Sequence, residues 1–177
     1  MGRWNIRWSI LLVLWCVTGG KLVAMKVESL DRGWFFNRGY ESQAADKVTV
    51  DLPHTWNAAD AMFGNVNYYR GVSTYSRFIV VPSSENFKRV FLRVKAAQTV
   101  ADVYLDNHFV AQHKGGYTSF TVELTHLIRK GEKHKLDIRV SNAQTMEIAP
   151  ICGDFNIWGG LNRGVALLDT ADACVAT

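Results

Sequence analysis

The feature that most constrains this fold is an alternation of apolar and polar residues with a period of two. Such alternation puts successive side chains on opposite faces of an extended strand. Alternating, β-branched or apolar runs recur at residues 48–52, 73–81, 90–95, 101–106, 120–125, 135–141 and 165–168. No stretch of ten or more residues has a convincing helical period. We therefore expect antiparallel strands, each with one face on a core and one face in water.

Turn signals separate these runs. Asp106 and Asn107 tolerate a positive φ and lie between two apolar-rich runs, which predicts a two-residue hairpin turn. Further breaks lie at 82–86, 115–116 and 130–132. Short strands at this regular spacing predict an all-β fold in a single domain, either a β-sandwich or a jelly roll. The last residues, 169–177, lack the alternation, and we expect them to be frayed.

Composition excludes several classes of protein. The 177 residues are 48% hydrophobic, which is too apolar for a disordered chain and enough for a sizeable core. With 3 Cys, 14 Gly and 3 Pro, the chain is neither a disulfide scaffold nor a collagen. The net charge of +4 comes without a run of five like charges, so the sequence indicates no nucleic-acid partner.

The N-terminus is typical of a secretory signal. Arg3 and Arg7 precede a continuously apolar stretch at 9–17. That stretch is shorter than the roughly 20 apolar residues that span a bilayer, so we expect no membrane span. We expect residues 1–24 to be a signal peptide, 25–177 to be the mature domain, and the protein to be exported, either periplasmic or secreted. Two alternatives stay open: lipid attachment through Cys16, and a buried N-terminal strand.

One loop has the composition of a binding site. Asp154 lies in residues 152–160, which are rich in glycine and aromatic residues. Glycine lets the backbone approach a ligand closely, and an Asp carboxylate accepts hydrogen bonds from hydroxyl groups. Phe155 and Trp158 offer flat apolar faces on which sugars stack. The alternative is a tight loop whose aromatic residues belong to the core.

The remaining candidates for chemistry form no complete set. Five of the six glutamates, at positions 41, 85, 123, 132 and 147, are scattered, mostly over turns and the outer faces of strands. The five histidines lack the spacing of metal ligands. We expect His54 to bond the backbone of its own loop, and Cys152 and Cys174 either to pair or to be two separate buried thiols. No nucleophile elbow, phosphate loop or paired-cysteine motif is present. The residues therefore predict a binding loop, with no catalytic residue, metal or cofactor.

Several motifs, in this order and spacing, resemble the opening of the glycoside hydrolase family 2 enzymes. The resemblance covers about residues 27–168 and is strongest for the β-galactosidase branch, although β-glucuronidases and β-mannosidases share much of it. The motifs are Trp34-Phe35-Phe36 with Gly39, Asp51-Leu52-Pro53-His54-Thr55-Trp56, Tyr69-Arg70-Gly71, Tyr75-Ser76-Arg77-Phe78, and the segments 89–92, 101–110, 113–120 and 153–165.

This resemblance implies a galactose-binding-like jelly-roll domain that precedes an immunoglobulin-like domain and a TIM barrel. The family's two catalytic glutamates lie in the barrel, so we expect the present chain to be inactive alone. Asp154 matches the family's Asp that reaches the sugar subsite. Asn65 matches an Asn that some β-galactosidases present beside it. Arg163 matches an Arg that we expect to tie the loop to the following strand.

Three functions follow from these expectations. The first is the sugar-binding domain of a β-galactosidase-like enzyme, with Asp154, Asn65 and Trp158 as substrate-binding residues. The second is a free-standing carbohydrate-binding module, and the third is a structural domain that docks on a partner barrel. Without a barrel to pack on, such an aromatic loop would be exposed and prone to non-specific association. This favours the first function, in which the domain packs on a barrel.

Overall fold

The computed structural model describes residues 25–39, 48–60, 68–83, 88–148 and 157–171. Within these residues the chain forms ten β-strands and no helix. The strands are β1 (Lys26–Ser29), β2 (Trp34–Arg38), β3 (Val48–Val50), β4 (Val72–Val80), β5 (Arg89–Val94), β6 (Val100–Leu105), β7 (His108–Lys114), β8 (Phe120–Glu123), β9 (Lys133–Ser141) and β10 (Val165–Thr170).

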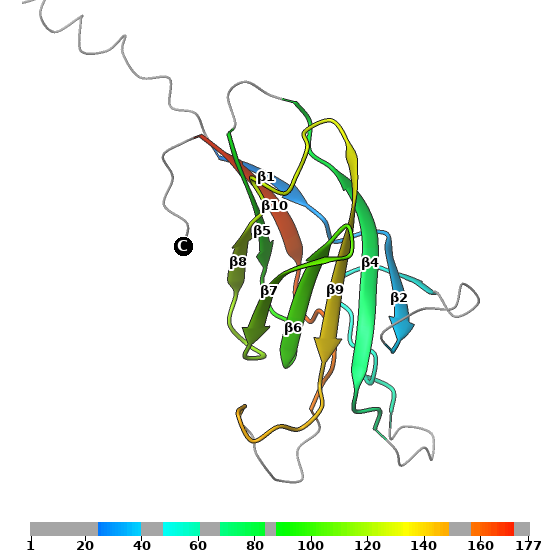
Figure 1. Ribbon diagram of the computed structural model, residues 1–177. Coiled ribbons are helices and arrows are strands. Elements are labelled where there is room, and N and C mark those ends of the chain that lie inside the picture. Colours follow the sequence, from blue (N-terminus) through cyan, green and yellow to red (C-terminus); the bar gives the residue numbers. More distant parts are fainter. Residues whose placement is uncertain (1–24, 40–47, 61–67, 84–87, 149–156, 172–177) are drawn as a thin grey trace, which may run out of the picture.

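The strands form two facing sheets (Figure 1). One has four strands in the order β1-β10-β5-β8, and the other has six in the order β3-β2-β4-β9-β6-β7. Every strand pair is antiparallel. This arrangement confirms the predicted all-β sandwich.

The core lies between the two sheets, where the alternation predicted it. The six side chains expected from the three clearest strands are all at most 3% exposed: Val90, Leu92, Val103, Leu105, Ile138 and Val140. They pack in one cluster with two large aromatic residues, Trp34 and Tyr75, which are fully buried. Burial of this apolar surface is the main force that holds the sheets together.

Two further predictions, the hairpin turn and the frayed C-terminal stretch, can be compared with the structure. Asp106 and Asn107 have φ of 49° and 67°, which confirms the hairpin turn between β6 and β7. The expectation for the C-terminal stretch was wrong at its start, because Asp169 and Thr170 belong to β10 and pair with Val90 and Arg89 of β5. Main-chain pairing with a neighbouring strand needs no alternation of side chains, so the sequence pattern could not indicate it.

The part of the chain described above contains no helix long and apolar enough to cross a membrane.

Candidate functional site at the loop end of the sandwich

The predicted binding loop lies at one end of the sandwich, the lower end in Figure 1. Its described part, residues 157–161, runs beside the segment that follows β3. Two main-chain bonds join them, from His54 N–H to the Leu161 carbonyl (2.9 Å) and from Trp56 N–H to the Gly159 carbonyl (3.1 Å). On its other side Gly160 forms an isolated β-bridge with Gln98.

Two glycines allow this close approach. A Cβ atom added at Gly159 would lie 2.1 Å from Cζ2 of Trp56, so only a hydrogen fits there. Gly160 has a φ of +137°, and a Cβ atom there would lie 2.3 Å from the His54 carbonyl oxygen. The glycines of the loop therefore pack directly on the segment 54–56, which belongs to another of the motifs that carry the family resemblance, the one at 51–56.

Two buried asparagines bind the same loop. Asn57 donates from Nδ2 to the Ile157 carbonyl (3.0 Å) and accepts at Oδ1 from Gly159 N–H (2.9 Å). Asn142 donates from Nδ2 to the Ile157 and Tyr69 carbonyls, both at 3.0 Å. Both asparagines have 0% exposure, so they have left water entirely to make these bonds.

Trp158 lies between the two anchored residues, and its side chain is 42% exposed. It is therefore not a core aromatic, and the alternative interpretation of the loop fails at this position. The other two predicted binding residues, Asn65 and Asp154, lie outside the described residues, as do Phe155 and the two cysteines, Cys152 and Cys174.

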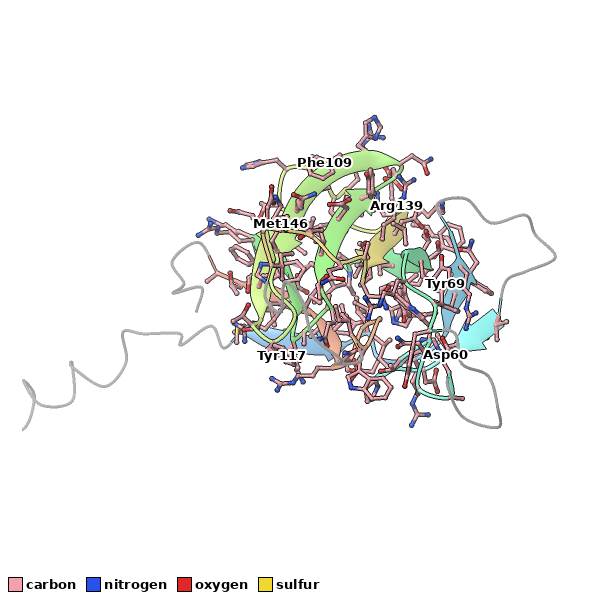
Figure 2. All side chains as sticks on the ribbon, turned by 90° about the horizontal axis from the view of Figure 1, so that it is seen from below. Asp60, Tyr69, Phe109, Tyr117, Arg139 and Met146 are labelled. Atoms are coloured by element: carbon pink, nitrogen blue, oxygen red, sulfur yellow. The ribbon has the colours of Figure 1, made fainter. Side chains whose placement is uncertain are left out.

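A chain of polar side chains extends from the loop across the end of the sandwich. Asn162 donates to Gln98 Oε1 (2.9 Å), and Gln98 Nε2 donates to the Tyr117 hydroxyl (3.1 Å). Thr55 donates to Asn162 Oδ1 at 3.3 Å. Gln98 is 4% exposed whereas Tyr117 is 69% exposed, so the chain leads from the interior to solvent. Figure 2 looks onto this end, with Tyr117 on one side and Tyr69 and Asp60 on the other.

His54 has a different partner from the expected one. Its Nδ1 lies 2.7 Å from the hydroxyl of buried Tyr75, and its main-chain N–H, rather than its ring, makes the bond to the loop. Burial lowers the pKa of His54 and raises the pKa of Tyr75, so both groups are neutral near pH 7. The pair is suited to packing and to a neutral hydrogen bond rather than to proton transfer.

Arg163, which we expected to tie the loop to the following strand, has an exposed side chain, and much of that loop lies outside the described residues, so this role stays a prediction. The start of β10 is held by Asp31, because its Oδ1 accepts from the N–H of Val165, the first residue of that strand (2.8 Å). A Cβ atom at Gly164 would lie 2.6 Å from this carboxylate, so the glycine makes room for it.

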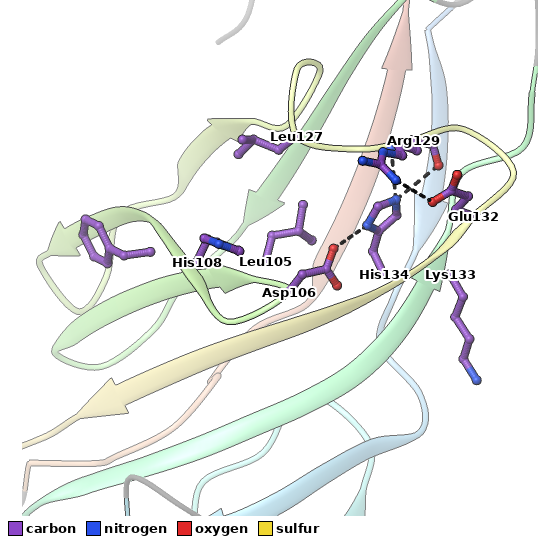
Figure 3. A pocket seen from close by; sticks show the side chains of 9 residues that line it. Leu105, Asp106, His108, Leu127, Arg129, Glu132, Lys133 and His134 are labelled. Atoms are coloured by element: carbon purple, nitrogen blue, oxygen red, sulfur yellow. Dashed lines mark hydrogen bonds and ion pairs between the residues drawn. The ribbon is translucent and has the colours of Figure 1, made fainter.

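A second polar cluster lies at the opposite end of the six-stranded sheet, around a cavity of about 400 Å³. Figure 3 shows Asp106 of the hairpin turn directed at His134, the buried second residue of β9. Nδ1 of His134 lies 2.6 Å from the Asp106 carboxylate, and Nε2 of His134 lies 3.0 Å from the main-chain nitrogen of Arg129. No group of three or more His, Cys, Asp or Glu in the described residues is arranged to hold a metal ion.

Three further residues of the site, Asn57, Gln98 and Asn142, could not be singled out from the sequence. Asn57 directly follows the quoted motif 51–56, which was the one available signal for it. Gln98 and Asn142 lie just outside predicted strands, where polar residues are common and carry no signal. What makes them part of the site is a set of partners 15 to 102 residues away in the sequence.

Comparison with known proteins agrees with this geometry. Residues 28–171 match the family model described as glycosyl hydrolases family 2, sugar binding domain. The chain is 38% identical over 147 residues to a β-glucuronidase of Bacteroides fragilis, covering 83% of this chain and 21% of that protein. It is 31% identical over 121 residues to a β-galactosidase of Thermoanaerobacter pseudethanolicus, covering 67% of this chain and 16% of that protein.

A solved structure has the same fold. The crystal structure of a Bacteroides uniformis β-glucuronidase superposes with a TM-score of 0.73 at 32% identity, over 82% of this chain and 18% of that one. The present chain thus spans about a fifth, or less, of each of these proteins. Because the family model covers most of the chain, including both motifs of the loop end, the protein belongs to glycosyl hydrolase family 2 through its sugar-binding domain.

Proposed function

We propose that this chain supplies the sugar-binding face of a family 2 glycosidase that acts on β-glucuronides or β-galactosides, with bond cleavage carried out elsewhere. The observation that carries the proposal is the half-exposed Trp158 on an anchored loop at the end of the sandwich. A large, flat apolar side chain held in one place offers a surface for the face of a pyranose ring.

Asp154 and Asn65 complete the proposed subsite. In the sequence, Asp154 precedes Ile157 by three residues and Asn65 precedes Tyr68 by three. The carbonyls of Ile157 and Tyr69 both accept from Nδ2 of Asn142, so the chain segments that follow the two candidates are joined at one amide group. This closeness in sequence to residues bonded by one side chain is what supports assigning both candidates to the same subsite.

The resemblance in the sequence favours a β-galactoside, whereas the relatives include enzymes named for two different sugars. Of the two relatives described above, the one with the higher identity is a β-glucuronidase and the other is a β-galactosidase. The two sugars differ at C4, where the hydroxyl is equatorial in a glucuronide and axial in a galactoside, and at C6, where a glucuronide carries a carboxylate. An Asp at the subsite is better matched to hydroxyl groups than to that carboxylate, so we assign Asp154 to the hydroxyl side of the ring.

A free-standing carbohydrate-binding module is the second candidate. The exposed aromatic groups at the loop end, Tyr117 and Trp158, are compatible with direct binding of sugar from solvent. Met146, 82% exposed at the same end, favours instead a surface that packs on further protein.

We also propose that the protein is exported, through the basic and apolar segment at residues 1–24.

The test is a chimera in which this chain replaces the corresponding domain of the Bacteroides fragilis β-glucuronidase. A hydrogen bond to a charged acceptor contributes about 1.5–3 kcal/mol in a closed site, so Asp154→Ala should lower kcat/KM by roughly ten- to a hundredfold. A chimera that turns over substrate and is unaffected by Asp154→Ala would contradict the subsite.

Calorimetry on the chain alone separates the two candidates. For a domain that shares its sugar with a barrel, we expect millimolar or weaker affinity for galactose and glucuronate, because the translational and rotational cost of binding is not offset in an open site. Micromolar binding by the 177-residue chain would establish the free-standing module instead.

A further inference from the structure

Both peptide groups that flank Trp158 are anchored by side chains from distant parts of the sequence. On the N-terminal side, the Ile157 carbonyl accepts two hydrogen bonds, from Nδ2 of Asn57 and from Nδ2 of Asn142, both at 3.0 Å. On the C-terminal side, Gly159 N–H donates to Oδ1 of Asn57 at 2.9 Å. One amide group thus bridges the two residues on either side of the indole.

The asparagines are themselves fixed. Asn142 accepts at Oδ1 from Gly71 N–H (2.8 Å) and donates to the Tyr69 carbonyl, so it is held by the chain just before β4. Both asparagines have 0% exposure. A buried amide that loses a partner pays a desolvation penalty, so each asparagine favours a single arrangement of the loop.

The underside of the loop is fixed as well. Gly159 packs on the ring of Trp56 with no room for a Cβ atom, and its carbonyl accepts from Trp56 N–H. Trp56 is 6% exposed and Ile157 is also 6% exposed, whereas Trp158 between them in the loop is 42% exposed. The neighbours are buried and bonded, and only the indole is left in contact with solvent.

We propose that Asn57 and Asn142 are positioning residues that hold the Trp158 indole outward as a pre-set stacking surface for a pyranose ring. The proposal rests on the sugar-binding function above and adds how that function is prepared. An indole that is already oriented loses less conformational freedom when a ligand binds, so the anchoring raises affinity without a contact of its own.

The experiment uses the full chain labelled with 5-fluorotryptophan, with the Trp158 fluorine signal assigned by Trp158→Phe. Asn57→Ala and Asn142→Ala should each shift or broaden that signal, because the flanking peptide groups lose their partners. Asn57→Asp is a milder second variant, since it keeps the acceptor for Gly159 N–H and loses only the donor. Asn37→Ala is the matched control: Asn37 is 4% exposed on β2, and among the described residues its amide bonds only the neighbouring Arg38 carbonyl.

Sugar binding is measured in the same samples through the Trp158 fluorine signal, with methyl β-D-glucuronide and methyl β-D-galactoside as probes. We expect one of them to shift the Trp158 signal in the unmodified chain, and Asn57→Ala to weaken that binding by roughly tenfold. By calorimetry the double variant Asn57→Ala with Trp158→Ala should bind no more weakly than Trp158→Ala alone, because the asparagine acts through the indole.

The two proposals fail in different ways. A Trp158 signal that neither asparagine substitution changes overturns the positioning role, even if sugar shifts it. A Trp158 signal that neither glycoside shifts in the unmodified chain overturns the stacking surface and the proposed sugar contact, even if the asparagine variants change it.

Discussion

His134 and Asp106 form a hydrogen-bonded ion pair that fastens the β6–β7 hairpin turn to the start of β9, with 2.6 Å between Nδ1 and Oδ2. The same carboxylate accepts from Lys135 N–H at 2.8 Å. Burial by itself would lower the pKa of His134, but its bonds to the Asp106 carboxylate and the Arg129 carbonyl outweigh burial and raise it. Burial would likewise raise the pKa of Asp106, and the bonds from His134 and Lys135 lower it.

These shifts predict where the pair stabilises the fold. The contribution of His134 is fully present below its ordinary pKa of 6.5 and is lost as pH rises through the raised value. The contribution of Asp106 is present above its ordinary pKa of 3.8 and is lost as pH falls through the lowered value. The pair therefore stabilises most between about pH 4 and pH 6.5.

Asp106→Asn tests this window, because Asn keeps the acceptor for Lys135 N–H and tolerates the φ of 49°. The loss of unfolding free energy should be larger at about pH 5.5 than at about pH 9 in urea titrations. His54, whose lowered pKa opposes stability in acid, is unchanged in both proteins and cancels in the difference. The control is Asp102→Asn on β6. The carboxylate of Asp102 accepts from Gln112, and its substitution should lower the free energy of unfolding by the same amount at both pH values.

Gly159→Ala should destabilise the protein by about 1–3 kcal/mol through overpacking, since its Cβ atom would lie 2.1 Å from the Trp56 ring. The loop must then move away from segment 54–56, and Trp158 with it. Thermal unfolding measures the cost. Combination with Trp56→Leu, which opens space beneath the loop, should be less damaging than the sum of the two single changes; simple additivity would refute the packing argument.

Lys135→Met should destabilise the protein by about 1–3 kcal/mol, because it removes the cation 2.8 Å from the carboxylate of Asp137. The Asp137 side chain is 5% exposed and its Oδ1 has no hydrogen-bond partner among the residues that the structure describes, so it depends on this ion pair. The lysine is 39% exposed, which keeps the cost below that of a fully buried pair. Lys135→Met with Asp137→Asn should recover most of the loss in a denaturant titration, and no recovery would contradict the explanation.

We expect the purified 177-residue chain to show no turnover of nitrophenyl β-galactoside or nitrophenyl β-glucuronide. Retaining glycosidases need an acid/base and a nucleophile about 5–5.5 Å apart, and the family places both on a barrel. An absorbance or fluorogenic assay of the stringently purified chain measures glycoside hydrolysis. Activity that copurifies with the chain and disappears in Asp154→Ala would make this domain an enzyme in its own right.

The candidate site could be predicted from the sequence only in part. Trp158 could be singled out because glycine and aromatic residues in one loop are unusual, and its exposure agrees with a binding role. The ring of His54 was assigned a partner that it does not have, because the sequence shows which residues are polar but not which atoms face them. Its partner is the hydroxyl of Tyr75 on β4.

What the sequence by itself determined is most of the strands, the faces that several of them turn to the core, and the hairpin turn. Alternation at Val90–Val94 and Val103–Leu105 determines a core because each strand has only two faces, and Asp106 and Asn107 determine a turn because they tolerate a positive φ. These are local properties of the backbone and its neighbouring side chains.

Only the tertiary structure decided which loops meet and what holds them. Asn57 and Asn142 are 85 residues apart and look like ordinary loop asparagines, yet both donate to the carbonyl of Ile157. A hydrogen bond depends on the distance and direction between two atoms, and for residues so far apart these are set by the packing of the two sheets. The orientation of Trp158 therefore follows from the assembled sandwich and not from the residues around it in the chain.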